Sequence, residues 1–190
     1  MRNRIINMVT TSMLAAVATV LFIFFKFPIF YAFPYLTFDF SDIPALLAGI
    51  ICGPVYAVAV ELIKNLIELI TEGAGKTLGF GNIMNFIVGC AFTVPFSILF
   101  RRLKWNSAPL KITVGCLAGM VGILLFGIAG NYLIAPLYFK FFVGTALSAD
   151  DTWKAVVGGT LMNLVKGGTL CAASVPVCLF VKKIWPSIKL

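Results

Sequence analysis

The chain has 190 residues, of which 61% are hydrophobic and only 12% are charged, and its formal net charge is +8. A soluble domain has about 45–50% apolar and about 25% charged residues, so this composition excludes an ordinary soluble domain and indicates an integral membrane protein. At about 20 residues for each membrane-spanning helix, the chain has room for five or six helices.

The apolar segments predict an all-α integral membrane protein, a single membrane domain over residues 1–190. The first segment follows two basic residues, as a signal peptide does, but it is long enough to span and its small residues are spread along it. We therefore interpret it as a retained helix. The second and third segments are short and separate at Gly53-Pro54. The six predicted transmembrane helices cover residues 6–25, 42–52, 55–70, 80–99, 112–131 and 153–181.

The basic residues gather at three places that six helices would bring to one side of the membrane. No Asp or Glu shares that side, and the positive-inside rule therefore predicts that both termini are cytoplasmic, in a multi-pass protein of the cell (plasma) membrane. No soluble basic face exists to bind nucleic acid. The three groups are Arg2 and Arg4, then Arg101, Arg102, Lys104 and Lys111, then Lys182, Lys183 and Lys189.

Polar residues inside the apolar segments mark a candidate site, because their burial in a bilayer is costly. The segment 55–70 carries Glu61, Lys64, Asn65 and Glu68 at helical spacing, which places them on one face. One interpretation is a satisfied Glu–Lys network that pairs along its own helix and holds the bundle together. The other is that these residues belong to a binding site.

Three later segments add polar side chains at similar depth. With the topology above, all of them lie in the outer half of the membrane, which predicts a pocket that opens outward. No arginine lies in that half, and its lysines are offset by acids, so the ligand is expected to be neutral and planar or amphipathic. The aromatic loop 27–40 could cover such a ligand or form an interfacial belt. These polar residues are Asn82, Asn85, Asn131, Asn163 and Lys166.

The sequence offers no catalytic or metal site. There is no histidine, and the five cysteines lie in apolar segments without a C-x-x-C pair. The G-A-G-K-T run at 73–77 is not a phosphate-binding loop, because the position of its required first glycine holds Ile70. We expect no enzyme activity, no metal and no cofactor, and any ATP hydrolysis on partner subunits.

Two rows of small residues follow one side of the first segment. Thr11, Ala15 and Thr19 form one row, and Ser12 and Ala16 form the other. Such rows allow another helix to approach closely, so this helix is a candidate docking face for a partner. Packing within the same bundle is the alternative.

Several runs together resemble the riboflavin-specific substrate-binding subunit, or S component, of energy-coupling factor (ECF) transporters. The resemblance extends from the first helix to the last. The runs that carry it are Y-L-T-F-D-F-S-D-I-P-A-L-L-A-G-I-I-C-G-P from Tyr35, the E-L-I-K-N that follows, G-N-I-M-N-F-I-V-G at 81–89 and L-M-N-L-V-K at 161–166.

The resemblance implies a six-helix subunit that binds riboflavin from outside and works with a transmembrane coupling subunit and two ATPase subunits. It implies that Asn131, Asn163 and Lys166 hydrogen-bond the ligand and that Asn85 forms part of the wall. The loop formed by Tyr35, Leu36, Thr37 and Asp39 would be a lid. Ser12, Ala15, Ala16 and Thr19 would contact the coupling subunit, although the A-x-x-x-A pattern usual in the family is not intact here.

The resulting functional prediction is a high-affinity riboflavin-binding subunit of an ATP-driven vitamin importer, with FMN as an alternative ligand. A stand-alone, proton-coupled secondary transporter that uses Glu61, Lys64 or Glu68 as a relay is a second hypothesis. Its weakness is that no polar residues continue the path to the inner side. A small intramembrane enzyme would need a nucleophile–base pair or a metal cluster, and the sequence shows neither.

Overall fold

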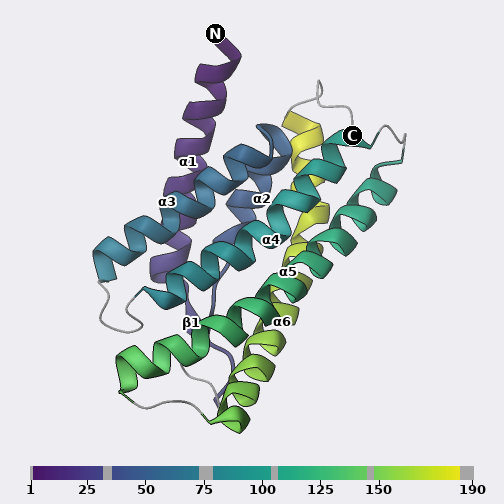
Figure 1. Cartoon of the computed structure of the whole chain (residues 1–190). Coiled ribbons are helices and arrows are strands. Elements are labelled where there is room, and N and C mark those ends of the chain that lie inside the picture. Colours follow the sequence, from purple (N-terminus) through teal and green to yellow (C-terminus); the bar gives the residue numbers. More distant parts are fainter. Residues whose placement is uncertain (1, 32–35, 73–78, 104–106, 145–147, 185–190) are drawn as a thin grey trace.

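The computed structural model describes residues 2–31, 36–72, 79–103, 107–144 and 148–184. A π-helical turn, η1 (Phe139–Val143), extends α5, and a small antiparallel hairpin of β1 (Phe27–Pro28) and β2 (Thr37–Phe38) lies between α1 and α2 (Figure 1). The described chain is therefore a bundle of helices with one short hairpin. The helices are α1 (Arg2–Phe24), α2 (Asp42–Ile51), α3 (Pro54–Glu72), α4 (Phe80–Arg102), α5 (Ala108–Tyr138) and α6 (Ala149–Ile184).

Helix α2 lies at the centre of the bundle. It packs against α1, α3, α4 and α6, and its residues Ala45, Leu46, Ala48 and Ile50 have no exposed surface. The predicted break after α2 is confirmed. Gly53 has a φ of 121°, which a side chain would disfavour, and Pro54 begins α3, where its missing N–H costs no helical hydrogen bond.

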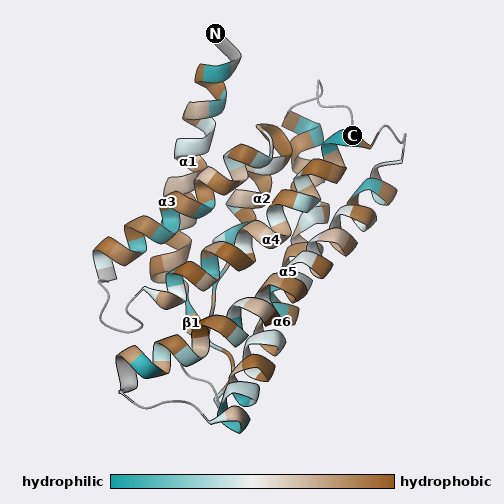
Figure 2. Ribbon diagram, viewed as in Figure 1, coloured by the Kyte–Doolittle hydropathy of each residue, from teal (hydrophilic) through white to brown (hydrophobic). Residues whose placement is uncertain are grey.

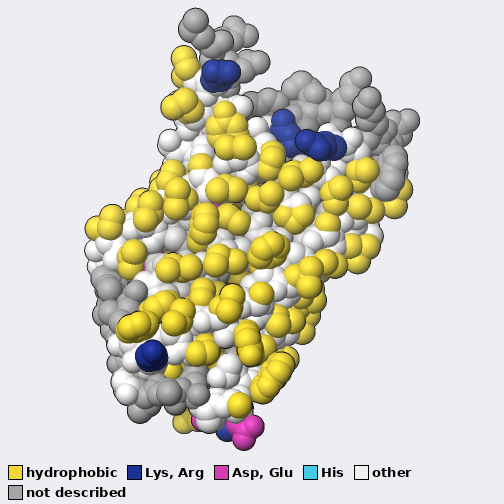
Figure 3. All heavy atoms as spheres, viewed as in Figure 1, with side chains coloured by type: hydrophobic (Ala, Val, Ile, Leu, Met, Phe, Trp, Pro, Cys, Tyr) yellow, Lys and Arg dark blue, Asp and Glu magenta, His cyan; other side chains and the backbone are white. Residues whose placement is uncertain are grey.

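Four of the described helices, α1, α4, α5 and α6, are long and apolar enough to cross a membrane by themselves. Helix α2 has only ten residues, and α3 carries four charged residues within nineteen. The surface agrees with a membrane environment, because hydrophobic residues run along the helices in Figure 2 and are spread over the whole length of the face seen in Figure 3, where charged side chains are few. Exposed examples on α5 include Leu125 and Leu133.

All the helices except α2 extend beyond their predicted bounds, and for α5 and α6 the reason can be identified at one end. Helix α5 continues past Asn131 to Tyr138. The asparagine does not end the helix, because its side chain lines a cavity. Helix α6 begins at Ala149 instead of residue 153. The Oγ of Ser148 accepts a hydrogen bond from the backbone N–H of Asp151 at 3.1 Å, which caps the first turn.

Candidate ligand-binding site

A cavity of about 540 Å³ lies between the ends of α1, α3, α4, α5 and α6 and is bordered by the β1–β2 hairpin. Its volume is in the range of small-molecule sites, which is about 300–1,000 Å³. Its polar wall consists of Lys26, Thr37, Asp39, Glu68, Asn82, Asn85, Asn131, Asn163 and Lys166. Its larger apolar and aromatic wall residues are Phe22, Leu36, Phe80, Met84, Val88, Ile134, Tyr138, Phe139 and Met162.

The structure brings the predicted ligand-binding residues together, although they come from the hairpin region and three different helices. Tyr35, one residue of the predicted set, lies outside the described residues. Residues 73–77, with the G-A-G-K-T run, lie outside them as well. The predicted residues that line the cavity are Leu36, Thr37, Asp39, Asn85, Asn131, Asn163 and Lys166.

Lys166 connects the cavity to the interior of the bundle. Its ammonium lies 3.0 Å from Asp42 Oδ2 and 3.7 Å from Asp39 Oδ2, and it also donates to Asn85 Oδ1. Asn85 in turn donates to Asn65 Oδ1 at 3.2 Å. These contacts fix the position of the ammonium and the amide before any ligand arrives, so both groups are preorganised at the cavity wall.

Behind this wall, Lys64 is the centre of a buried ionic cluster. Its side chain has no exposed surface, and its Nζ lies 2.8 Å from Glu61 Oε2 and 2.8 Å from Ser41 Oγ. It also pairs with Asp42, whose side chain is buried too. The four residues come from α2, α3 and the turn before α2, so the cluster ties these elements together while remaining behind the lining of the cavity.

Glu68 belongs to a separate group at the rim of the cavity. It forms an ion pair at 2.6 Å with Lys26, which follows the end of α1, and accepts a hydrogen bond from Asn82 of α4. The interpretation that the charges of α3 pair along their own helix therefore holds for Glu61 and Lys64, whereas Glu68 pairs with other elements and lines the cavity. Neither Lys26 nor Glu68 is among the predicted ligand-binding residues. A lysine directly after an apolar helix is the signal that points to Lys26.

The aromatic loop contributes less to the cavity than expected. Its described aromatic residues do not line the cavity; Phe27, Phe38 and Phe40 pack on one another, with ring centroids 5.0–6.4 Å apart. Asp39 of the predicted lid is buried and accepts hydrogen bonds from the N–H and hydroxyl of Ser41. The aromatic wall comes instead from helical residues of α1, α4 and α5.

The predicted docking residues on α1 divide into two groups. Ser12 and Ala16 are exposed, whereas Ala15 and Thr19 are buried at 1% and 7% exposure. Ala15 packs in a cluster with Ala45 of α2, so a partner helix cannot reach it. Ala15 and Thr19 therefore take part in packing within the bundle, and Ser12 and Ala16 are the exposed members of the predicted docking set.

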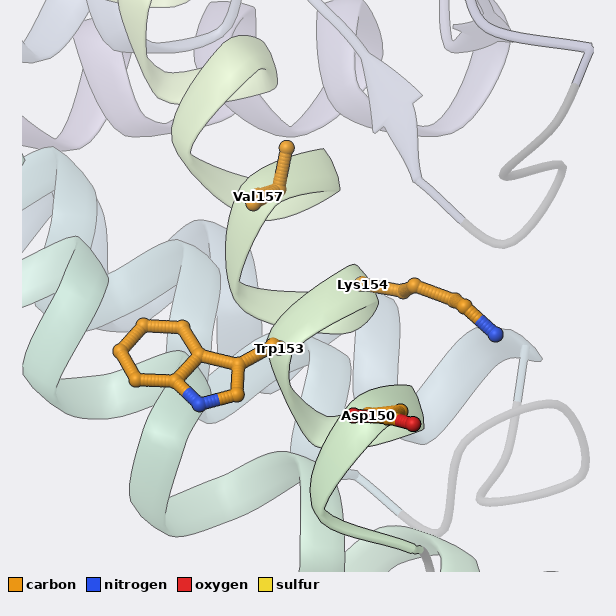
Figure 4. Close-up of a pocket in the computed structure, with 4 residues that line it drawn as sticks. All are labelled: Asp150, Trp153, Lys154 and Val157. Carbon is orange, nitrogen blue, oxygen red and sulfur yellow. The ribbon is translucent and has the colours of Figure 1, made fainter.

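A second hollow, of about 410 Å³, lies beside the first turns of α6. Asp150, Trp153, Lys154 and Val157 line it, and all four come from one helix. Figure 4 shows Trp153 and Lys154 pointing to different sides of that helix. Because its polar groups do not converge, this hollow lacks the features of a binding site.

The fold and the cavity define a membrane-embedded helical protein that holds a small ligand. The sequence model of the protein family "ECF transporter, substrate-specific component" matches residues 7–179, and the chain therefore belongs to this family. A solved S component of a bacterial ECF transporter aligns with all of this chain and all of its own, with a TM-score of 0.69 and 27% identity.

Curated relatives come from several bacteria. The chain is similar to the riboflavin transporter FmnP of Bacillus subtilis (strain 168), with 39% identity over 85% of this chain and 84% of the relative. It is also similar to the riboflavin transporter RibU of Staphylococcus aureus (strain TCH60), with 34% identity over 85% and 82% of the two chains. RibU of Streptococcus thermophilus (strain ATCC BAA-250 / LMG 18311) is 30% identical over 68% and 60%.

Proposed function

We propose that this chain is the riboflavin-binding S component of an ECF-type importer. Family membership supports the subunit class, and the names of the curated relatives support the vitamin. The same comparisons do not favour the stand-alone proton-coupled transporter. The chain captures riboflavin at the outer side of the plasma membrane, and a coupling subunit with two ATPase subunits provides the energy for its release inside.

The observation that carries the ligand proposal is the chemistry of the cavity wall. Asn85, Asn131 and Asn163 present amide groups that both donate and accept hydrogen bonds, as the edge of a flavin ring requires. Each lysine of the wall faces an acid, since Lys26 pairs with Glu68 and Lys166 with Asp42. No arginine is among the described cavity residues. A neutral ligand therefore suits the wall better than the phosphate of FMN.

An absorbance spectrum tests this function most directly. The chain purified in detergent is expected to carry a flavin band, or to acquire one on addition of riboflavin, with quenching of its tryptophan fluorescence. Calorimetric titrations with riboflavin and with FMN separate the two ligands, and riboflavin is expected to bind more tightly. A colourless chain that ignores riboflavin would contradict the ligand assignment, whereas uptake abolished by a protonophore without ATPase partners would support the secondary transporter.

Replacement of Asn163 by alanine is expected to weaken riboflavin binding by about 1–3 kcal/mol, because polar groups of the ligand lose their partner. Titration calorimetry on the purified chain measures the change. Asn7→Ala is the matched control, since Asn7 lies in the first turns of α1 and does not line the cavity. Equal affinities of the wild type and Asn163→Ala would remove this residue from the site.

We extend the proposal to the orientation in the membrane. Figure 1 shows α1 beginning at the end of the bundle where α6 finishes. This arrangement supports six spans with both termini in the cytoplasm, because cations gather at that end. The described cations at the start of α1 and the ends of α4 and α6 are Arg4, Arg101, Arg102, Lys182 and Lys183.

Reporter fusions test this topology. A fluorescent protein that matures only in the cytoplasm is expected to fluoresce when fused after residue 190, and an alkaline phosphatase that is active only outside the cytoplasm is expected to stay inactive there. The same two reporters inserted after Ser148, before α6, should give the opposite result. Active phosphatase at the C-terminus would contradict the proposed orientation.

A further inference from the structure

Two glycines on neighbouring helices make room for two of the amides that line the cavity, those of Asn131 and Asn163. Helix α5 carries Gly127 four residues before Asn131, and α6 carries Gly159 four residues before Asn163. Residues four apart lie on the same face of a helix. Each helix therefore presents one glycine and one asparagine, one turn apart, toward its neighbour.

The contacts between the helices are reciprocal. A methyl carbon added to Gly127 would overlap Asn163 Nδ2, and one added to Gly159 would overlap Asn131 Nδ2. Each amide thus lies directly on the backbone of the opposite helix, where no other residue type leaves space. One turn forward along α5 corresponds to one turn back along α6, as expected for antiparallel neighbours.

The amide nitrogen of Asn163 is packed against Gly127 rather than exposed at the cavity surface. Its side chain is 6% exposed, it lines the cavity, and its Nδ2 has no hydrogen-bond partner among the described residues. Only the exposed part of this side chain can reach a ligand in the cavity, so the contact between its nitrogen and Gly127 determines how that part is presented. Gly127 allows the Asn163 amide to lie close to the backbone of α5. A side chain at position 127 would displace this amide toward the cavity, into the space that the ligand needs.

We propose that Gly127 and Gly159 are positioning residues for the ligand, acting through Asn163 and Asn131 respectively. This inference rests on the proposed riboflavin-binding function. The glycines set the depth and orientation of the two amides, and so the fit of a flat ring between α5 and α6. Gly127 does not line the cavity, whereas Gly159 borders it. The effect of Gly127 on binding passes through the Asn163 amide, and that of Gly159 passes chiefly through the Asn131 amide, whose atoms lie nearest to the place of an added methyl carbon.

The experiment is a double-mutant cycle with riboflavin as the probe and the full chain in detergent. Gly127→Ala and Gly159→Ala are each expected to weaken riboflavin binding at least about tenfold, the equivalent of one lost hydrogen bond. In an Asn163→Ala background, Gly127→Ala is expected to have less than about a twofold further effect, because the amide it displaces is gone. Gly159→Ala is likewise expected to have a smaller effect in an Asn131→Ala background than in the wild type.

Gly168→Ala is the matched control, because Gly168 lies on α6 and no atom lies within 4 Å of the place that an alanine methyl carbon would occupy there. It is expected to bind riboflavin like the wild type. The flavin absorbance band of the complex gives a second measurement, since a displaced amide changes the hydrogen bonding of the ring. Gly127→Ala should shift this band and Gly168→Ala should not.

The outcomes separate this inference from the proposed function. A wild-type chain that does not bind riboflavin would overturn both. A wild type that binds, together with glycine variants of unchanged affinity, would overturn the inference alone. If Gly127→Ala weakens binding or prevents folding equally with and without the Asn163 amide, the glycine acts through helix packing and the inference is overturned. Coupling between each glycine and its asparagine would support it.

Discussion

Replacement of Lys64 by methionine is expected to lower the free energy of unfolding by about 3–5 kcal/mol, the usual effect of removing one partner from a buried ion pair. Lys64 has no exposed surface, and its removal leaves Glu61 without its cation and Asp42 with Lys166 alone. Methionine keeps most of the length and volume of the side chain, so the loss reflects charge rather than a cavity. Titration with a denaturing detergent, followed by circular dichroism, measures the change.

Two variants provide controls for this result. Lys154→Met breaks the pair between Lys154 and Asp151, whose side chains are 69% and 50% exposed, and exposed pairs contribute at most about 1 kcal/mol. Adding Glu61→Gln to Lys64→Met removes the carboxylate that has lost its cation and is expected to restore part of the lost stability. If Lys64→Met is as stable as Lys154→Met, the buried cluster does not stabilise the bundle.

The buried cluster and the cavity form one connected system. Asp42 accepts a hydrogen bond from Lys64 through Oδ1 and forms an ion pair with Lys166 through Oδ2. One carboxylate therefore connects the buried ionic cluster to the cavity wall. Helix α2, which carries Asp42, is enclosed by four other helices. The cavity wall is therefore anchored to the interior of the bundle, as a preorganised binding site requires.

The helices could be predicted because apolar length and turn residues determine them locally. The Gly53-Pro54 break, the polar face of α3 and the grouping of the basic residues at the helix ends are all visible in the sequence. Helix ends are harder to place. The sequence predicts a helix end at Asn131 and does not reveal the Ser148 cap, because a polar residue ends a helix in one context and faces a cavity in another.

Several polar residues of the cavity could be identified from the sequence, but their contacts could not. Which partner each side chain meets depends on helix rotation and crossing, which a single sequence does not specify. This is why the sequence leaves open whether Glu68 pairs with Lys64 and does not reveal its pairing with Lys26. The residues themselves stand out because polar side chains are rare in apolar helices, and this rarity identifies Asn85, Asn131, Asn163 and Lys166.

Ala16→Leu is expected to leave riboflavin binding intact and to abolish uptake in cells that contain the coupling and ATPase subunits. Ala16 is exposed on α1 beside Ser12, so a larger side chain fits without disturbing the bundle, yet it prevents close approach of a partner helix. Binding is measured by calorimetry on the purified chain, and uptake by radiolabelled riboflavin. The prediction rests on the proposal that the exposed row of α1 contacts the coupling subunit.

Ala15→Leu distinguishes this effect from damage to the fold. Ala15 is buried against α2, so three added carbons overpack the core and are expected to cost about 1–3 kcal/mol of stability. Val121→Leu, an enlargement at an exposed position of α5, should change neither stability nor uptake. Normal uptake by Ala16→Leu would show that the partner docks elsewhere. Loss of binding in that variant would show that this row supports the cavity, because a pure docking defect leaves the isolated chain able to hold its ligand.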